Sequence, residues 1–503
     1  MSLIKSISGI RGTIGGPAGE GLTPLDVVKF TSAFATFLKG ERSKVKGERL
    51  KLAVGRDARL SGAMVDRLVV GTLQGMGVDV LETGLSTTPT TEMTVIDGHC
   101  DGGIIITASH NPKHWNALKL LNSKGEFISD KEGKEVLRLA DAMSRQDNET
   151  SSHQDPGARS LEDSKSGSLI NYAEVDELGQ VTVEEDWIDR HIERVLGLEL
   201  VDVEAIRKAG FKVAVDAVNS TGGIAIPRLL RRLGVTDVVE LNCEPTGHFA
   251  HNPEPIPQNL TQISDCVREN HCDLGIVVDP DVDRLALVCE TGEMFGEEYT
   301  LVSVADYVLQ HTPGNTVSNL SSSRALRDVT RRYAGCEYNA AAVGEVNVTT
   351  LMRETGAVIG GEGNGGVIYP ALHYGRDALV GVALFLTLLA KEGERSKVKG
   401  ERLTVSELKK RYPEYVISKN RKDLTPDMDV DALLAKVAKH YQVESGKWKV
   451  ESVNTIDGVK IDFADGWVHL RKSNTEPIIR IYSEAATEER ANELAKGVMG
   501  EIG

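Results

Sequence analysis

Cysteine, basic charge and long apolar stretches are all scarce in this sequence. Six cysteines are spread over 503 residues without a Cys-x-x-Cys pair, which argues against a disulfide framework or a zinc site and indicates reduced thiols. The formal net charge of −16 argues against nucleic acid or an anionic membrane as a partner of the whole surface. No apolar run is long enough to span a bilayer, and the N-terminal residues contain no apolar signal segment. We therefore expect a cytoplasmic protein.

The sequence does have the composition of a soluble globular protein, with 26% charged and 40% apolar residues. Its length predicts three to four domains. Helical and strand-like patterns alternate up to about residue 143, with a helix expected over 25–38, a strand over 50–54 and a helix over 63–75. The polar stretch 144–168 has almost no large apolar residue and is predicted to be a disordered or weakly ordered insertion.

The first motif is Thr107-Ala108-Ser109-His110-Asn111-Pro112, which follows a β-branched run, Gly102–Ile106, that is typical of a buried strand. Open α/β sheets bind ligands at the ends of their strands, so Ser109 is expected on a ligand-binding rim. A hydroxyl there can accept and return a phosphoryl group, provided that a cation and hydrogen-bond donors neutralise the phosphate oxygens. Taken alone, the motif also fits an ordinary turn or cap.

The second motif places three aspartates in five residues, Asp279, Asp281 and Asp283, followed by Arg284. Carboxylate oxygens at this density suit Mg²⁺ or another hard divalent ion. A calcium-binding EF-hand loop is an alternative, because these aspartates and Glu290 occupy its positions 1, 3, 5 and 12. However, the glycine needed at position 6 is Arg284 here, and both flanking segments are predicted strands rather than helices. An acidic turn without metal is a further alternative.

Two more segments carry groups suited to a sugar and to a phosphate. In Gly360–Gly366 the glycines let the backbone approach a ligand, and Glu362 and Asn364 offer groups for sugar hydroxyls or an amine. The segment 471–477 joins two strand-like runs, and its polar side chains form a dense donor set for a phosphate. A flexible glycine loop and a solvated hairpin turn are the respective alternatives. The candidate phosphate ligands are Arg471, Ser473, Asn474 and Thr475.

These four segments, in this order, resemble the loops of the α-D-phosphohexomutase superfamily, whose members interconvert hexose 6-phosphates and hexose 1-phosphates. We call them the phosphoserine loop (107–112), the metal loop (279–284), the sugar loop (360–366) and the phosphate loop (471–477). The resemblance covers most of the chain. Two further segments match it. They are Gly9-Ile10-Arg11-Gly12, whose arginine lies in the family's active site, and Asn116-Ala117-Leu118-Lys119, which ends in an active-site lysine.

The resemblance implies an α/β fold of three similar α/β domains with mixed sheets and a smaller C-terminal α+β domain, arranged around a central cleft. The phosphoserine loop belongs to domain I, the metal loop to domain II, the sugar loop to domain III and the phosphate loop to domain IV. The expected ranges are 1–143, then a polar insertion or linker over 144–168, then 169–291, 292–410 and 411–503.

The resemblance also implies a phosphoserine mechanism. Ser109 carries the phosphoryl group and, together with Asp279, Asp281 and Asp283, holds Mg²⁺. Ser109 gives its phosphoryl group to a free sugar oxygen, which forms a hexose 1,6-bisphosphate, and then receives the other phosphate. Lys119 is the implied acid/base, with a pKa that burial among cations is expected to lower.

Other residues are expected to bind the substrate or the moving group. Arg11, His110 and Arg284 would stabilise the transferring phosphoryl group, with an orienting role as the alternative for His110. The four candidates of the phosphate loop would bind the substrate phosphate, while Glu362 and Asn364 would meet the sugar hydroxyls. The expected partners are a hexose phosphate and a hexose 1,6-bisphosphate activator.

The sugar loop indicates which hexose is bound. Asn364 and Gly366 stand where other family loops carry serine and histidine, and the pattern resembles the phosphoglucosamine mutases first recognised in archaea. Glu345 and Glu362 could offer negative charge to a 2-ammonium group. We therefore expect interconversion of glucosamine 6-phosphate and glucosamine 1-phosphate. The alternatives are a phosphomannomutase/phosphoglucomutase and a non-catalytic sugar-phosphate-binding protein.

One polar segment occurs twice without change, as Gly40–Leu50 and Gly393–Leu403. Each copy follows an apolar helix pattern, and ancient structural repeats diverge in sequence. We interpret it as a duplicated short insertion in two surface loops, which tolerate additions. A basic docking tag is the alternative.

Overall fold

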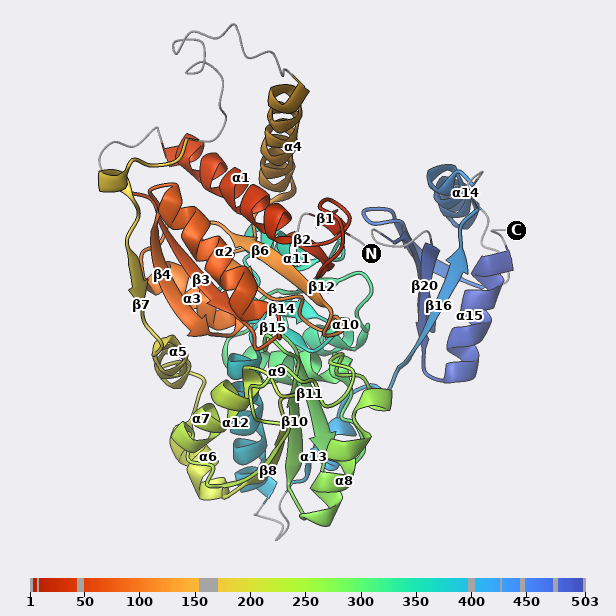
Figure 1. Cartoon of the computed structure of the whole chain (residues 1–503). Helices are drawn as coiled ribbons and strands as arrows, with labels where there is room; N and C mark the ends of the chain where they lie inside the picture. Colours follow the sequence, from red (N-terminus) through yellow and green to blue (C-terminus); the bar gives the residue numbers. More distant parts are fainter. Residues whose placement is uncertain are drawn as a thin grey trace, which may run out of the picture.

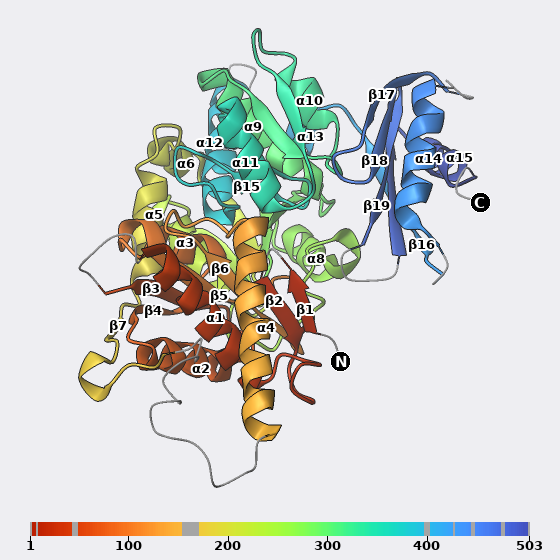
Figure 2. The same ribbon diagram turned by 90° about the horizontal axis from the view of Figure 1, so that it is seen from above.

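The computed structural model describes residues 3–6, 9–42, 49–152, 171–396, 403–425, 428–443, 448–473 and 478–500. Its strands form four sheets. Figures 1 and 2 show the C-terminal sheet, in blue, standing to one side of the other three, whose colours run from red through green to turquoise. Most of both copies of the duplicated segment, and residues 153–168 of the predicted insertion, lie outside the described residues.

The first sheet has seven strands in the order β1-β2-β6-β5-β3-β4-β7. The central strand β5 is buried along its whole length, as its continuous apolar run predicts. The strands are β1 (Leu3–Ser6), β2 (Gly9–Thr13), β3 (Lys51–Arg56), β4 (Asp79–Leu85), β5 (Gly102–Ile106), β6 (Trp115–Leu121) and β7 (Val181–Val183). The accompanying helices are α1 (Pro24–Arg42), α2 (Gly62–Gly75), α3 (Thr88–Asp97) and α4 (Asp130–Ser152). Strand β7 pairs with β4, although its residues lie in the range that we predicted for the second domain.

Helix α4 corrects one expectation. It continues to Ser152, so residues 144–152 of the predicted weakly ordered insertion are helical. Val136, Ala140 and Met143 bury one side of its first turns in the core of the first domain. Once that part is fixed, each added residue gains a backbone hydrogen bond, so the helix extends into a polar sequence.

The second and third sheets have four strands each, in the orders β11-β10-β8-β9 and β13-β12-β14-β15. In both, three strands are parallel and the last is antiparallel. The strands are β8 (Lys212–Asp216), β9 (Asp237–Leu241), β10 (Leu274–Val278), β11 (Leu285–Cys289), β12 (Thr316–Asn319), β13 (Tyr338–Ala341), β14 (Ile359–Glu362) and β15 (Gly366–Ile368). The order β6-β5-β3-β4 in the first sheet has the same directions. The predicted class of three similar α/β domains with mixed sheets is therefore confirmed.

Helix α12 joins the second and third domains. Its first part is apolar on every side, and residues 378–390 are all buried, as expected for a helix surrounded by protein. It packs against α5, α6 and α9, and one continuous apolar core spans both domains. The helices of this region are α5 (Trp187–Leu196), α6 (Val203–Ala209), α7 (Gly222–Arg232), α8 (Thr261–Glu269), α9 (Glu297–His311), α10 (Ala325–Thr330), α11 (Glu345–Thr355), α12 (Ala378–Ser396) and α13 (Val405–Lys409).

The C-terminal domain is the expected smaller α+β unit. Its five strands are antiparallel, in the order β16-β20-β19-β18-β17. The elements are β16 (Val416–Asp423), α14 (Val430–Val443), β17 (Val450–Asn454), β18 (Val459–Phe463), β19 (Gly466–Lys472), β20 (Ile478–Ala485) and α15 (Glu488–Gly500). Both helices cover the same face of this sheet (Figure 2), where they share one apolar core with the strands.

Candidate active site

Three of the four expected loops occupy the same place in three similar sheets. In each sheet the third parallel strand (β5, β10 or β14) is followed by a loop and an antiparallel strand (β6, β11 or β15). These connections contain the phosphoserine loop, the metal loop and residues 363–365 of the sugar loop, whose Glu362 is the last residue of β14. Ligands of open α/β sheets bind beyond the carboxyl ends of the strands, so the repeated topology offers three chemically different loops at equivalent rims.

Ser109 faces the metal loop directly. Its Oγ donates a hydrogen bond of 2.7 Å to Asp279 Oδ2, and its backbone N–H donates to Thr107 Oγ1 at 2.9 Å. Its φ of 48° lies in the left-handed region, which is uncommon for a residue with a Cβ and is frequent at functional sites. The loop therefore holds the predicted nucleophile in a conformation that an ordinary turn does not require.

Arg59 fixes this loop and was missed by the sequence reasoning. Its Nη1 donates to the carbonyl oxygens of Pro112 and Trp115 at 3.0 and 3.1 Å, and its Nη2 donates to that of Ser109. Its Nε donates to Asp57 Oδ2 at 2.9 Å. The side chain is fully buried. In the sequence, Arg59 is only an arginine a few residues after a predicted strand. The three carbonyl groups that it binds lie 50 to 56 positions away, so no local pattern indicates this role.

The metal loop gathers the three predicted aspartates. Asp279, Asp281 and Asp283 are fully buried, and one oxygen from each lies within 4.8 Å of the others. Burial, followed by the charges of Asp283 and Asp281, raises the pKa of Asp279 well above its usual range. Because the flanking elements are the paired strands β10 and β11, the EF-hand alternative is wrong.

Lys119 lies in this acidic group, and its expected pKa shift was wrong. Its Nζ is 2.7 Å from Asp281 Oδ2 and 3.4 Å from Asp283 Oδ2. Burial lowers the pKa of Lys119, but these two carboxylates outweigh burial and raise it above its usual range. The side chain is thus surrounded chiefly by carboxylates rather than by cations, which sequence spacing could not show.

Arg11 and Arg284 form a cationic side of the same site, next to His110. Arg11 Nη1 donates to Asn111 Oδ1 at 3.2 Å. His110 Nδ1 is 3.4 Å from Ser109 Oγ. Burial, followed by the charges of Arg284 and Arg11, holds the pKa of His110 well below its usual range. Ser109 is therefore beside a neutral imidazole, whose pKa both arginines help to lower.

The sugar loop joins the metal loop through Arg376. Its Nη2 donates to Asp283 Oδ2 at 2.8 Å, its Nη1 lies 3.1 Å from Glu362 Oε2, and its Nε donates to Glu345 Oε2 at 2.8 Å. Glu362 also accepts from Asn319 Nδ2 at 2.8 Å. Arg376 was not among the predicted site residues, because nothing in its local pattern distinguishes it from an arginine before a helix.

Asn364 and Glu345 contact the same arginine. Asn364 Oδ1 accepts from the Gly366 N–H at 3.2 Å and lies 3.5 Å from Arg376 Nη1. Glu345 also accepts from the Arg376 N–H at 3.1 Å. Glu345 is therefore engaged by an arginine, which weakens its expected role as a free negative charge for an ammonium group.

The comparisons with known proteins agree with this geometry. Models of the phosphoglucomutase/phosphomannomutase α/β/α domains I, II and III and of the C-terminal domain match residues 3–147, 189–292, 296–410 and 420–501. The chain belongs to this family. A phosphoglucomutase/phosphomannomutase of Thermococcus kodakarensis is 36% identical over 98% of this chain and 97% of its own. A probable phosphoglucosamine mutase of Methanopyrus kandleri is 32% identical over 97% of this chain and 95% of its own.

The fold of the chain is also found in a solved structure. A phosphoglucomutase/phosphomannomutase family protein of Burkholderia thailandensis superposes with a TM-score of 0.78, at 24% identity, over 99% of this chain and 96% of that chain. The protein is a phosphohexomutase, and hence an isomerase. The resemblance inferred from the four loops is confirmed.

The metal loop of this phosphohexomutase has the donors that a hard cation requires. Asp281 Oδ1 and Asp283 Oδ1 are buried and have no hydrogen-bond partner among the described residues. Unpartnered buried carboxylate oxygens are costly, and oxygen ligands of this kind suit Mg²⁺. Ser109 Oγ lies close enough to Asp279 to join the same site. The donor set therefore fits a divalent cation.

The phosphate loop of this phosphohexomutase lies in the C-terminal domain. Arg471, at the end of β19, has its Nη1 3.6 Å from Asp457 Oδ2. Ser473 is buried, and its N–H donates to the Ile478 carbonyl at 2.9 Å. Asn474 and Thr475 lie outside the described residues, so the structure says nothing about their predicted role.

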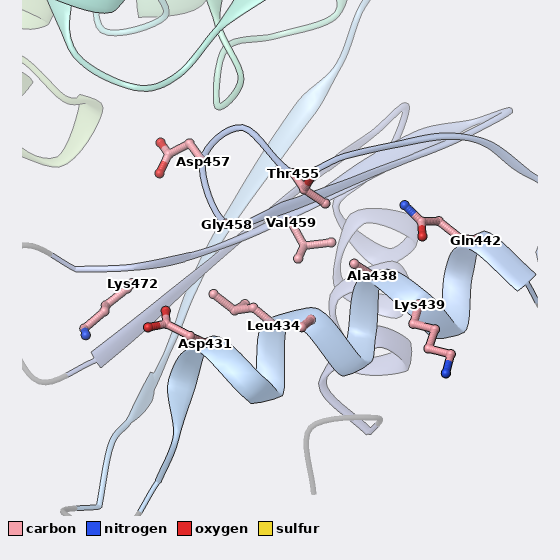
Figure 3. A pocket seen from close by; sticks show the side chains of 11 residues that line it. Asp431, Leu434, Ala438, Lys439, Gln442, Thr455, Asp457, Gly458, Val459 and Lys472 are labelled. Atoms are coloured by element: carbon pink, nitrogen blue, oxygen red, sulfur yellow. The ribbon is translucent and has the colours of Figure 1, made fainter.

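A cavity of about 530 Å³ lies beside this loop, between α14 and the β17–β18 turn. Figure 3 shows Asp431 and Lys472 at one end and Gln442 at the other. Asp457, which pairs with Arg471, also lines it. None of its lining residues comes from the phosphoserine, metal or sugar loop.

Within the described part of the chain, no helix is both long enough and apolar enough to cross a membrane.

Proposed function

We propose that the protein interconverts glucosamine 6-phosphate and glucosamine 1-phosphate through a phosphoserine at Ser109. The observation that carries the catalytic part is the hydrogen bond from Ser109 Oγ to Asp279 Oδ2, which places a hydroxyl against three buried carboxylates. A phosphoryl group on that oxygen would lie between the cation held by the carboxylates and the cationic side formed by Arg11 and Arg284. Such an arrangement supplies the charge stabilisation on which phosphoryl transfer depends.

The proposed cation is Mg²⁺, held by Asp279, Asp281, Asp283 and Ser109 Oγ. When bound, it neutralises charge on the transferring phosphate oxygens. With the carboxylates neutralised, the groups that raise the pKa of Lys119 are lost, while burial and Arg376 continue to lower it. This change would let Lys119 exchange a proton with a sugar hydroxyl.

The reaction has two transfers. In the first, a sugar oxygen attacks the phosphorus on Ser109, the bond from phosphorus to Oγ breaks, and the hydroxyl proton passes to Lys119. The product is a glucosamine 1,6-bisphosphate. After the intermediate turns over, its other phosphate moves to Ser109 Oγ, and Lys119 returns the proton to the sugar oxygen that is released. Positioning and charge stabilisation provide most of the acceleration.

The preference for an amino sugar rests on the sugar loop. Glu362 is engaged by protein groups, because it accepts two hydrogen bonds and pairs with Arg376. A second carboxylate of this region, that of Glu298, lies against Gly363 of the sugar loop. Burial raises the pKa of Glu298 well above its usual range, and an ammonium beside it would favour its charged form. A side chain at residue 363 would collide with this carboxylate, so Gly363 leaves room for it. The name of the Methanopyrus kandleri relative points to the same sugar.

A phosphomannomutase/phosphoglucomutase is the second candidate. The Thermococcus kodakarensis relative with that name has 36% identity to this chain. Carboxylates also bind plain sugar hydroxyls, so the same loop could accept glucose or mannose phosphates.

A mutase assay tests the proposal. The purified protein is given Mg²⁺ and a catalytic amount of hexose 1,6-bisphosphate, and turnover of glucosamine, glucose and mannose phosphates is compared. We expect the highest kcat/KM for glucosamine phosphate, no turnover by Ser109→Ala, and normal turnover by Ser452→Ala, a control in the C-terminal domain. Preference for glucose or mannose phosphate would overturn the substrate assignment. Activity in Ser109→Ala would overturn the mechanism.

A further inference from the structure

A group of buried titratable side chains lies at the junction of the three α/β domains, outside the loops described above. We call it the junction cluster. It comprises Glu92 of α3 in domain I, His191 of α5 in domain II, and His373 and Asp377 just before α12 in domain III. All four side chains are essentially inaccessible to solvent. Buried titratable groups are costly unless they are paired, so their presence here calls for a physical explanation.

The contacts of the cluster form one chain across the domains. Asp377 Oδ2 lies 3.0 Å from His191 Nε2 and 3.3 Å from His373 Nε2. The other ring nitrogen of His373, Nδ1, lies 3.3 Å from Glu92 Oε2. The second oxygen of Asp377, Oδ1, accepts from the backbone N–H groups of Leu379 and Val380 at the start of α12.

The hydrogen-bond directions assign the protons. Thr87 Oγ1 donates to Thr90 Oγ1 at 2.7 Å, which leaves the Thr90 hydroxyl proton for His191 Nδ1 at 3.0 Å. The proton of a neutral His191 is then on Nε2 and points to Asp377. His373 donates from Nε2 to the same carboxylate, and its Nδ1 lies 3.3 Å from Glu92 Oε2.

The pKa of His373 agrees with this assignment. Burial lowers it, but the contacts with Asp377 and Glu92 outweigh burial and raise it to about 10. Both Nε2 atoms and Asp377 Oδ2 lie close enough together to hold a metal ion. In the proton arrangement described above, however, both nitrogens donate to the carboxylate and neither has a lone pair free for a metal.

The same elements hold the metal loop on two sides. From α3, Thr88 Oγ1 donates to Asp281 Oδ2 at 2.6 Å, and the Thr88 N–H donates to the Asp281 carbonyl at 2.8 Å. From the start of α12, the Ala378 N–H donates to the Val282 carbonyl at 3.2 Å, and Arg376 reaches Asp283. The metal loop is thus bound to α3 and to the first residues of α12, and the junction cluster connects these two elements.

We propose that His373 is a positioning residue which, through Glu92 and Asp377, holds the metal loop in the geometry that binds the cation. Among the described residues, the hydrogen bonds and ion pairs of His373 go to Glu92 and Asp377 and not to the metal loop. This inference rests on the proposed cation site, and it concerns residues that neither carry the phosphoryl group nor contact it. Residues that orient metal ligands from behind commonly change metal affinity or activity by about 10- to 100-fold.

Binding of Mn²⁺ to the full-length protein, followed by electron paramagnetic resonance, tests the proposal without depending on turnover. We expect His373→Gln and Glu92→Gln each to weaken Mn²⁺ binding about tenfold or more. The double variant should be little worse than either single variant, because both act through one contact. His311→Gln, on the exposed end of α9, should bind Mn²⁺ as the unmodified protein does, and Asp281→Asn should lose binding.

Each outcome of this experiment either supports or overturns the proposed role of His373. Unchanged Mn²⁺ affinity in folded His373→Gln and Glu92→Gln overturns the proposal, and if His373→Gln does not fold, Glu92→Gln decides by the same criterion. A stoichiometric transition metal in the purified protein that is absent from His373→Gln would also overturn it, because the cluster would then be a metal site. If the unmodified protein binds no Mn²⁺, the proposed cation site fails and this inference fails with it. Failure of the inference alone would instead leave binding intact in every variant except Asp281→Asn.

Discussion

Lys119 Nζ lies 2.7 Å from Asp281 Oδ2, so a lysine of domain I is paired with the central aspartate of the metal loop in domain II. The two residues are 162 positions apart. Lys119 comes from β6, the antiparallel strand that follows the phosphoserine loop, and Asp281 comes from the turn between β10 and β11. The ion pair joins the phosphoserine side of the site to its cation side, and several tests follow from it and from its neighbours.

Replacing Lys119 should damage both stability and turnover. In Lys119→Met, Asp281 and Asp283 lose their nearest lysine partner, and a buried carboxylate without a partner is destabilising. We expect a lower Tm in the absence of Mg²⁺ and a kcat/KM reduced by about 10²–10⁴-fold, as for loss of a general acid/base. Lys124→Met, on an exposed turn, is the control. Full activity in Lys119→Met would rule out an acid/base role.

Replacing Asp279 should separate stability from cation binding. In the unmodified protein, a cation at 100 times its Kd stabilises by about 2.7 kcal/mol, so Mg²⁺ should raise the Tm measured by scanning calorimetry. In Asp279→Asn, one of three mutually repelling buried carboxylates is removed. We expect a Tm without Mg²⁺ at least equal to that of the unmodified protein and no rise with Mg²⁺. A normal rise would contradict the assignment of this ligand, and Asp265→Asn on α8 is the control.

Arg59 should matter through the loop that it holds. In Arg59→Lys the positive charge remains, but one ammonium cannot reach Asp57 and the three loop carbonyls in the same geometry. We expect unfolding to require about 1–3 kcal/mol less free energy and kcat to fall about tenfold with little change in KM. Denaturant titration and steady-state kinetics measure these effects. Arg67→Lys, exposed on α2, should show neither effect. An unchanged kcat in Arg59→Lys would mean that the phosphoserine loop keeps its geometry without Arg59.

Arg376 should couple the cation site to the sugar loop. In Arg376→Lys, the separate contacts with Asp283, Glu345 and Glu362 cannot all be kept by one point charge. We expect kcat/KM to fall about 10²-fold or more, with weaker binding of both Mg²⁺ and sugar phosphate by titration calorimetry. Loss of only one of the two affinities would contradict the coupling. Arg353→Lys, an exposed arginine of the same domain, is the matched control.

The stability of the protein should fall at alkaline pH because of His373. Its pKa in the folded protein is about 10, above the ordinary 6.5. The stabilisation from its protonated form is therefore fully present below about pH 6.5 and is lost as the pH rises toward 10. We expect Tm to fall more between pH 7 and pH 10 in the unmodified protein than in His373→Gln. Parallel curves for the two proteins would contradict this assignment.

Much of the fold could be predicted because the relevant signals are local. The apolar runs at Gly102–Ile106 and on both sides of the aspartates are strands in the structure, as predicted, and the apolar pattern of α12 is a buried helix. The four loops were recognised because the spacing of their glycines, carboxylates and serine can be identified from the sequence without knowledge of any tertiary contact. The amphipathic start of α4, by contrast, extended farther into polar sequence than composition indicated.

The sequence by itself determined the order of the loops, the residue types that suit a cation and a phosphoryl group, and the class of three α/β domains followed by a smaller one. Tertiary structure alone decided which charges meet. Lys119 was expected among cations and lies against two aspartates, and Arg376, Arg59 and the junction cluster were not predicted at all. The physical reason is that a pKa or an ion pair depends on the few groups within several ångströms, and here those groups come from segments as much as 281 positions apart, as for Glu92 and His373.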